Sequence, residues 1–70
     1  MKTLELFFHI HGSYSELRDK DNNCIFYKST NNSEIWNLDF RRMYSSEARN
    51  TLFIIDGLDY WYRDGNLMVV

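Results

Sequence analysis

The 70-residue sequence contains no proline, no glutamine, one alanine and one cysteine. A single cysteine cannot close an intramolecular disulfide, so the covalent bridges of small secreted domains are excluded and a cytoplasmic location is expected. The three glycines, Gly12, Gly57 and Gly65, are scattered, which excludes a glycine-rich phosphate-binding loop. No run of about 18 apolar residues occurs, so no membrane-spanning helix and no membrane partner are predicted.

An excess of charge of one sign is also lacking. Eight lysines and arginines against ten acidic residues give a formal net charge of -2, so long-range attraction of nucleic acid would be weak. The length predicts one small domain over residues 1–70, without room for an enclosed active site. Because apolar burial at about 25 cal/mol/Å² roughly cancels chain entropy at this size, the fold needs large buried side chains or oligomerisation.

Aromatic residues, in contrast, are abundant, with twelve Phe, Tyr and Trp side chains. Aromatic and β-branched residues favour strands over helices, and apolar residues alternate with polar ones along much of the chain. In residues 3–10 the alternation places four apolar side chains on one face of a strand: Leu4, Leu6, Phe8 and Ile10. Strand-like sequence continues over six further stretches: residues 14–20, 24–29, 34–40, 51–55, 58–63 and 66–70.

Turns between these strands are marked by Asn, Asp and Gly, which tolerate the left-handed backbone of tight hairpins. They are predicted at four places: residues 21–23, Asn31-Asn32, Asp56-Gly57 and Asp64-Gly65. Residues 43–50 are the one candidate helix, with Ser45 or Ser46 as N-cap and a loop as the alternative. We therefore predict a mainly β fold of five to six short antiparallel strands, forming a meander, a curled sheet or a small open barrel, with at most one short helix near residues 44–50.

Residues 18–40, RDKDNNCIFYKSTNNSEIWNLDF, resemble the Tyr- and Trp-rich β-hairpin repeats of small bacteriophage-encoded accessory proteins, in which D-x-N-x-x-I-x-Y-K-x-S-x-G-x-E-x-W recurs. DYWYRDGN, residues 59–66, is similar to the same pattern, and Asn32 stands where the repeat has its middle glycine. The two segments cover under half of the chain. The resemblance implies an accessory protein of phage or mobile-element type, without catalytic residues to carry over.

Two sets of residues are candidates for chemistry. His9 and His11 are spaced so that both side chains point to one side of a strand, as two ligands of a zinc ion would. A third ligand would have to come from Glu5 or Cys24, and two polar residues at a strand end are the simpler interpretation. Cys24 could act as a nucleophile only with a base within about 3 Å and an oxyanion pocket. We therefore predict no enzyme, no metal site and no cofactor.

Binding to a protein partner is the favoured function. A chain this small cannot cover both faces of its sheet, so some aromatic side chains should be exposed, and Trp, Tyr and Arg are enriched at interface hot spots. Alternation in residues 58–63 places Trp61 on the outer face, whereas its similarity to Trp36, which shares an expected buried face with Leu38 and Phe40, argues for burial. The alternation is the stronger indication, so Trp61 is expected on the outer face. The candidate partner-binding residues are Trp61, Tyr62, Tyr60, Arg63, Tyr44, Arg41 and Arg42.

The resulting hypothesis is a non-enzymatic inhibitor in the host cytoplasm that blocks a larger host or defence protein, of anti-CRISPR or anti-restriction type. The alternative is a small β protein that binds single-stranded nucleic acid through tyrosines and arginines. The apolar final strand, residues 67–70, is expected to be buried in the sheet or paired across a dimer. A homodimer through a strand edge is therefore a further candidate assembly.

Overall fold

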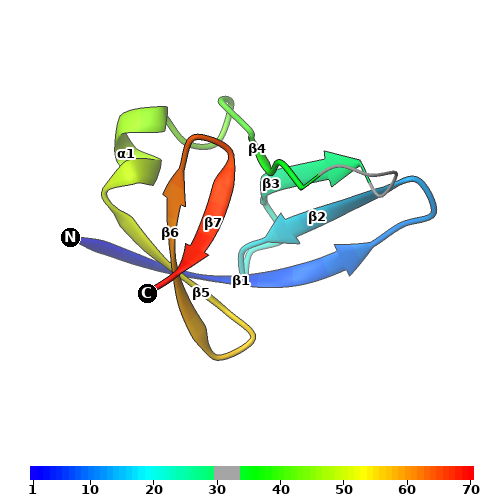
Figure 1. Cartoon of the computed structure of the whole chain (residues 1–70). Coiled ribbons are helices and arrows are strands. Elements are labelled where there is room, and N and C mark those ends of the chain that lie inside the picture. Colours follow the sequence, from blue (N-terminus) through cyan, green and yellow to red (C-terminus); the bar gives the residue numbers. More distant parts are fainter. Residues whose placement is uncertain (30–33) are drawn as a thin grey trace.

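The computed structural model describes residues 1–29 and 34–70, so the predicted turn at Asn31-Asn32 lies outside the described residues. The described chain forms one curled, half-barrel sheet and one short helix (Figure 1). The elements are β1 (Lys2–Ile10), β2 (Tyr14–Arg18), β3 (Cys24–Ser29), β4 (Asn37–Leu38), α1 (Ser45–Arg49), β5 (Thr51–Ile55), β6 (Leu58–Arg63) and β7 (Asn66–Val69). The predicted class is confirmed, with slightly more strands than expected.

The long strand β1 joins the two halves of the sheet, whose strand order is β4-β3-β2-β1-β5-β6-β7. Its first part, residues 2–6, pairs in parallel with β5. Its second part, residues 7–10, pairs antiparallel with β2. Parallel neighbours need a long connection, and here β2, β3, β4 and α1 supply it. This parallel ladder is the one pairing that local alternation and turn residues did not predict.

The hairpin turns at Asp56-Gly57 and Asp64-Gly65 are confirmed. All four residues have positive φ, as a two-residue type I′ turn requires, with 53° and 80° in the first turn and 51° and 87° in the second. At Gly65 a side chain would also collide, since a Cβ there would lie 2.9 Å from Ile35 Cγ2. Beside this contact the Trp36 N–H donates to the Gly65 carbonyl at 2.8 Å, which joins the two ends of the curled sheet at one point.

The core lies inside the curl, between the inner faces of the two halves. At its centre Phe26 of β3 meets Phe53 of β5 edge to face, with ring centroids 5.0 Å apart. The buried apolar residues are Leu6, Leu17, Ile25, Phe26, Trp36, Leu38, Met43, Ala48, Phe53 and Ile55. Leu4, Tyr60, Tyr62 and Leu67 pack against them. Inner side chains from β1, β2, β3, β5, β6 and β7 therefore fill one small core.

The segment from Trp36 to Arg49 departs from the prediction in two details. The predicted strand 34–40 is reduced to Asn37–Leu38, and although Trp36 and Leu38 are buried as expected, Phe40 is 68% exposed. The N-cap of α1 is Tyr44 in extended conformation, without a side-chain capping bond, so the serine N-cap is wrong. Met43, directly before Tyr44, is buried, and the first helical residue is Ser45. No helix among the described residues is long and apolar enough to cross a bilayer.

The inner face of β1 is buried only over its first part. Leu6 is 1% exposed, whereas Ile10, four residues further along the same face, is 69% exposed. Phe8 lies between them and is also exposed, with its ring 6.4 Å from that of Trp36. Leu4, Leu6, Phe8 and Ile10 share one face of β1, as predicted, but the other half of the sheet covers this face only as far as Leu6.

A pair of truncations on this face tests that boundary. Leu6→Ala removes fully buried methyl groups and leaves a cavity, so we expect it to lower the free energy of unfolding by about 2–5 kcal/mol. Ile10→Ala, on the same face, should change it by less than about 0.5 kcal/mol. Urea unfolding followed by tryptophan fluorescence measures both. Equal losses in the two variants would show that the core extends to the end of β1.

Candidate functional site

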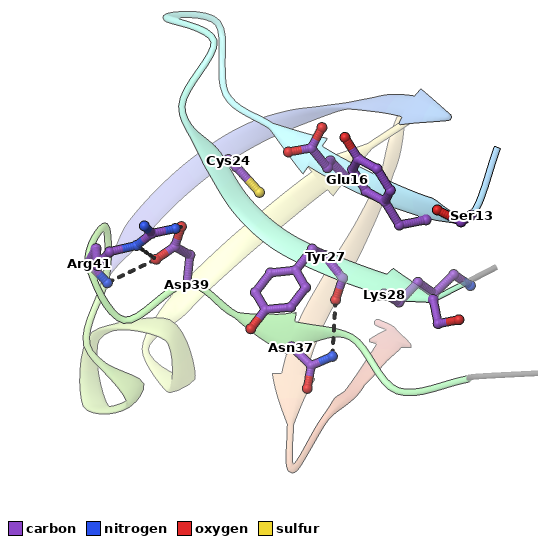
Figure 2. Close-up of a pocket in the computed structure, with 10 residues that line it drawn as sticks. Ser13, Glu16, Cys24, Tyr27, Lys28, Asn37, Asp39 and Arg41 are labelled. Atoms are coloured by element: carbon purple, nitrogen blue, oxygen red, sulfur yellow. Dashed lines mark hydrogen bonds and ion pairs between the residues drawn. The ribbon is translucent and has the colours of Figure 1, made fainter. Parts of the chain in front are cut away.

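The outer face of the sheet carries two groups of side chains that the core does not use. The first surrounds an open hollow of about 530 Å³ over β2, β3 and the segment containing β4 (Figure 2). Its lining residues are Ser13, Tyr14, Glu16, Cys24, Tyr27, Lys28, Ser29, Asn37, Asp39 and Arg41. Figure 2 shows the Cys24 thiol and the Tyr27 ring between Glu16 on one side and the Asp39–Arg41 pair on the other. We call this region the polar hollow.

Glu16, on β2, is a buried carboxylate that is hydrogen-bonded to the side chains of Arg18 and His11. Arg18, two residues further along the same strand face, donates from one guanidinium nitrogen to both carboxylate oxygens, at 2.9 and 3.0 Å. His11 Nε2 lies 2.7 Å from Oε1. Burial acts to raise the pKa of Glu16, but the hydrogen bonds of Arg18, His11 and Cys24 outweigh it and hold the pKa below its usual value.

Asp39 is the second buried carboxylate of the polar hollow. The side chain of Arg41 grips it in a fork, with Nε to Oδ1 at 3.0 Å and Nη2 to Oδ2 at 3.0 Å, and the Arg41 backbone N–H also donates to Oδ1. The bonds from Arg41 lower the pKa of Asp39 against the opposing effect of burial. Each carboxylate of the hollow is therefore ionised and bound to an arginine two residues away.

Cys24 is half-buried next to both carboxylates. Burial, the hydrogen bond to Glu16 and the negative charges of Glu16 and Asp39 raise the pKa of its thiol to about 11. Its Sγ also lies 3.4 Å from the carbonyl oxygen of Phe26, a second acceptor within reach of the same S–H. The His11 ring bonds through Nε2 to Glu16. The thiol stays protonated at neutral pH and is a poor nucleophile.

The two histidines do not form the paired metal ligands considered above. His9 is exposed on β1, directly opposite Glu16 of β2 in the strand register. His11 lies beyond the end of β1, where its ring stacks on Tyr14 with centroids 4.3 Å apart. In residues 1–29 and 34–70, no three His, Cys, Asp or Glu side chains gather in a way that would hold a metal ion.

The second group lies on the outer face of the other half of the sheet and is apolar. Trp61 of β6 pairs with Met68 of β7, and the register that pairs Phe53 with Tyr60 places Leu52 beside Trp61 on its other side. Ile54 follows on the same face of β5. Met68 is exposed and the other three are half-buried. We call these four residues, Leu52, Ile54, Trp61 and Met68, the outer apolar band.

Arg63 lies at one end of the outer apolar band and covers part of Trp61. Its guanidinium carbon is 5.2 Å from the centre of the indole ring, within the range of a cation–π contact. The same guanidinium donates to the carbonyls of Arg49 at 3.0 Å and Tyr62 at 2.7 Å, which fixes it between α1 and β6. A hollow of about 400 Å³ adjoins the pair, lined by Met1, Arg49, Asn50, Trp61 and Arg63.

The structure brings together Trp61 and Arg63 from the seven predicted partner-binding residues. Tyr60 and Tyr62 lie on the opposite face of β6 and pack against the core, with Tyr62 at 4.9 Å from the Phe26 ring. The other three belong to the connection between β4 and α1: Arg41, which borders the polar hollow, Arg42 and Tyr44. The predicted residues thus lie on several surfaces of the molecule.

Glu16 and Asp39 were missed as site residues, although the sequence carries a signal for both. Glu16-x-Arg18 and Asp39-x-Arg41 each place an acid and an arginine two residues apart. On the strand β2 this spacing puts both side chains on one face, whereas Asp39 and Arg41 are brought together by the turn that follows β4. What the spacing alone does not reveal is burial, which depends on strands elsewhere in the chain.

Comparisons with known proteins add no relative. No protein-family model, no curated protein and no solved structure matches the chain.

The raised pKa of the Cys24 thiol predicts that it reacts slowly with alkylating agents. A pKa of about 11, compared with the ordinary pKa of 9.0, leaves about 100-fold less thiolate at neutral pH. Alkylation of Cys24 by iodoacetamide should therefore be slower in the folded than in the unfolded chain by a similar factor. The rate should climb until the pH approaches 11. Glu16→Gln removes one of the causes and should accelerate the reaction. Equal rates for the folded and urea-unfolded chains at neutral pH would contradict this prediction.

The two buried carboxylates predict a loss of stability in acid. In the folded chain the pKa values of Glu16 and Asp39 lie below their ordinary values of 4.5 and 3.8. The contribution of these carboxylates to the free energy of unfolding is therefore complete above the ordinary values, and it is lost as the pH falls through the lower pKa values of the folded chain. Glu16→Gln leaves Arg18 without its carboxylate, so it should cost about 1–3 kcal/mol at neutral pH. The same variant should lose less than the wild type on acidification.

Urea unfolding at several pH values measures this dependence. Glu5→Gln is the matched control, since Glu5 is exposed on β1 and the substitution removes the same charge. It should reproduce the wild-type profile. If Glu16→Gln has the same slope against pH as Glu5→Gln, the bonds to Glu16 do not contribute to the acid sensitivity.

Proposed function

We propose that this chain is a non-enzymatic interaction module that binds a larger protein through the outer apolar band and the adjoining Arg63. The observation that carries the proposal is the position of Trp61, which lies between Leu52 and Met68 on a sheet face that the core does not use. An apolar row of this kind on one face, with charged residues at its rim, is typical of protein-binding surfaces.

The state of the Trp61–Arg63 pair supports a binding role. Tryptophan and arginine are the residue types most enriched at interface hot spots. Arg63 is already held by two carbonyls and by the indole ring, so little side-chain entropy remains to be lost when a partner binds. The hollow beside the pair offers a place for one side chain of the partner.

The chemistry of the polar hollow supports a non-enzymatic role. Its two carboxylates have lowered pKa values and are bound to arginines, and the thiol of Cys24 has a raised pKa. General acids, bases and nucleophiles work best with pKa values near the ambient pH, and these groups have been moved away from it.

The partner we propose follows from the resemblance to phage accessory proteins. It is a host or defence protein in the bacterial cytoplasm, which the chain would block sterically in the manner of an anti-CRISPR or anti-restriction factor. A second copy of the chain is a further candidate partner, at the free edge of β7. Single-stranded nucleic acid stays the alternative, but Arg18 and Arg41 are bound to carboxylates and Arg63 to carbonyls, which leaves them less available for phosphates.

Quantitative affinity capture from a bacterial lysate tests the proposal. Proteins that the tagged wild type retains should bind Trp61→Ala at least about 30-fold more weakly, which corresponds to a hot-spot loss of about 2 kcal/mol or more. Phe40→Ala is the matched control, because Phe40 is an aromatic residue that is 68% exposed, lies outside the band and is not a candidate partner-binding residue. It should retain the same proteins as the wild type.

Recovery of one and the same set of proteins by wild type, Trp61→Ala and Phe40→Ala would exclude the outer apolar band as the binding surface. Retention on single-stranded DNA at low salt, abolished by Trp61→Ala, would instead favour the alternative. All variants should first be shown to unfold at wild-type urea concentrations.

A further inference from the structure

The two edges of the sheet differ in their protection against further pairing. The β4 edge is two residues long and is followed at once by the charged Asp39–Arg41 pair. The β7 edge, Asn66–Val69, is twice as long and contains no charged residue and no proline. Short strands and charges are the usual means of blocking an edge, and β7 has neither.

The register of the β6–β7 hairpin shows which backbone groups face the free edge. Arg63 pairs with Asn66 and Trp61 with Met68, and the Val70 N–H donates to the Asp59 carbonyl at 3.0 Å. In an antiparallel ladder after a two-residue turn, these alternate residues exchange bonds with β6. The N–H and C=O groups of Leu67 and Val69, which lie between them, therefore point away from β6.

Little of the described chain covers this edge. Across it the described residues show one backbone hydrogen bond, from Trp36 to Gly65, which lies in the turn before β7 begins. Figure 1 shows β7 running from that point toward the crossing of β1 and β5. Val69 and Val70 are 62% and 70% exposed, although both are apolar.

We propose that β7 pairs antiparallel with β7 of a second copy of this chain, about a two-fold axis at Met68. In this register Leu67 lies opposite Val69 of the second copy, and the outward N–H and C=O groups of both residues meet in four backbone hydrogen bonds. Any other occupant would have to supply an extended strand of its own, whereas β7 matches itself without change.

The outer apolar band supports a second copy as the occupant. Its row from Leu52 through Trp61 to Met68 ends at the free edge of β7. In the proposed dimer Met68 lies beside Met68 of the second copy, so the row continues across the axis to a second Trp61. Side chains this close across a non-hydrogen-bonded position contact each other, and the exposed part of Met68 is covered.

The size of the contact indicates a weak dimer. A pairing of four-residue strands with a few side chains falls below the area of about 1,200 Å² that stable interfaces bury. We therefore expect a dissociation constant in the micromolar range or above. The inference does not rest on the proposed function, although a dimer would present two copies of the outer apolar band on one continuous sheet face.

Sedimentation velocity over a wide concentration range tests the dimer. The wild type should shift from the 8.5 kDa monomer toward twice that mass as its concentration rises to several hundred micromolar. Met68→Lys places two ammonium groups opposite each other across the axis and should weaken the dimer at least tenfold. Leu58→Lys is the control: it adds the same charge at a site of similar exposure, 52% against 55%, and should leave the dimer unchanged.

A second variant keeps the test independent of charge. Val69→Pro removes an outward N–H that makes no bond to β6, so it should abolish dimerisation while the hairpin persists, as proline is tolerated on edge strands. Urea unfolding at low micromolar concentration, where all variants are monomeric, checks that each one folds.

Three results would overturn the proposal: a wild type that stays monomeric at every concentration, a dimer that resists both Met68→Lys and Val69→Pro, or a dimer that Leu58→Lys weakens equally. A monomeric wild type that still captures a protein through Trp61 would overturn the dimer and leave the proposed function intact. A dimer without any Trp61-dependent capture would do the reverse.

Discussion

The rest of the structure depends on the double pairing of β1. Its first five paired residues form a parallel ladder with β5, and its last four form an antiparallel ladder with β2. One strand therefore belongs to both halves of the sheet, and its curl turns their inner faces toward each other. The contact of Phe26 with Phe53 at 5.0 Å is a direct result, because the two rings belong to different halves. Without the shared strand neither hairpin group could bury its aromatic side chains.

A single core inside a curl leaves the whole outer face without a covering layer, and the two halves meet this constraint differently. The β2–β3 half carries ionised groups there, and each buried carboxylate is neutralised by an arginine close in sequence. The β5–β7 half carries apolar side chains, with Arg63 laid over Trp61. A neutralised polar surface is stable in water as it stands, whereas an apolar one gains from being covered. This difference is why the outer apolar band, and not the polar hollow, carries the functional proposal.

What could be predicted from the sequence was local. The turns at Asp56-Gly57 and Asp64-Gly65 depend on residues that accept positive φ, and the outward position of Trp61 depends on alternation within one strand. The parallel β1–β5 ladder joins segments almost fifty residues apart, which neither turn chemistry nor alternation encodes. The burial of individual side chains could not be predicted for the same reason. Ile10 and Leu6 share a face of β1, but only Leu6 is covered by the opposite half of the sheet. Glu16 was overlooked because its burial requires His11 and Arg18 to close over it.

The coincidence of the apolar band with the unprotected edge has a physical origin in the size of the chain. A chain of this size is too short to form a second layer over its sheet. Apolar side chains on the outer face therefore stabilise the monomer only through contacts with their neighbours in the sheet. Trp61 has such neighbours on both sides, in Leu52 and Met68, but Met68 on the last strand has one on a single side. In the described part of the chain, the free energy that the outer face can still gain is therefore concentrated at β7, where apolar surface and outward-facing backbone groups meet in the same few residues.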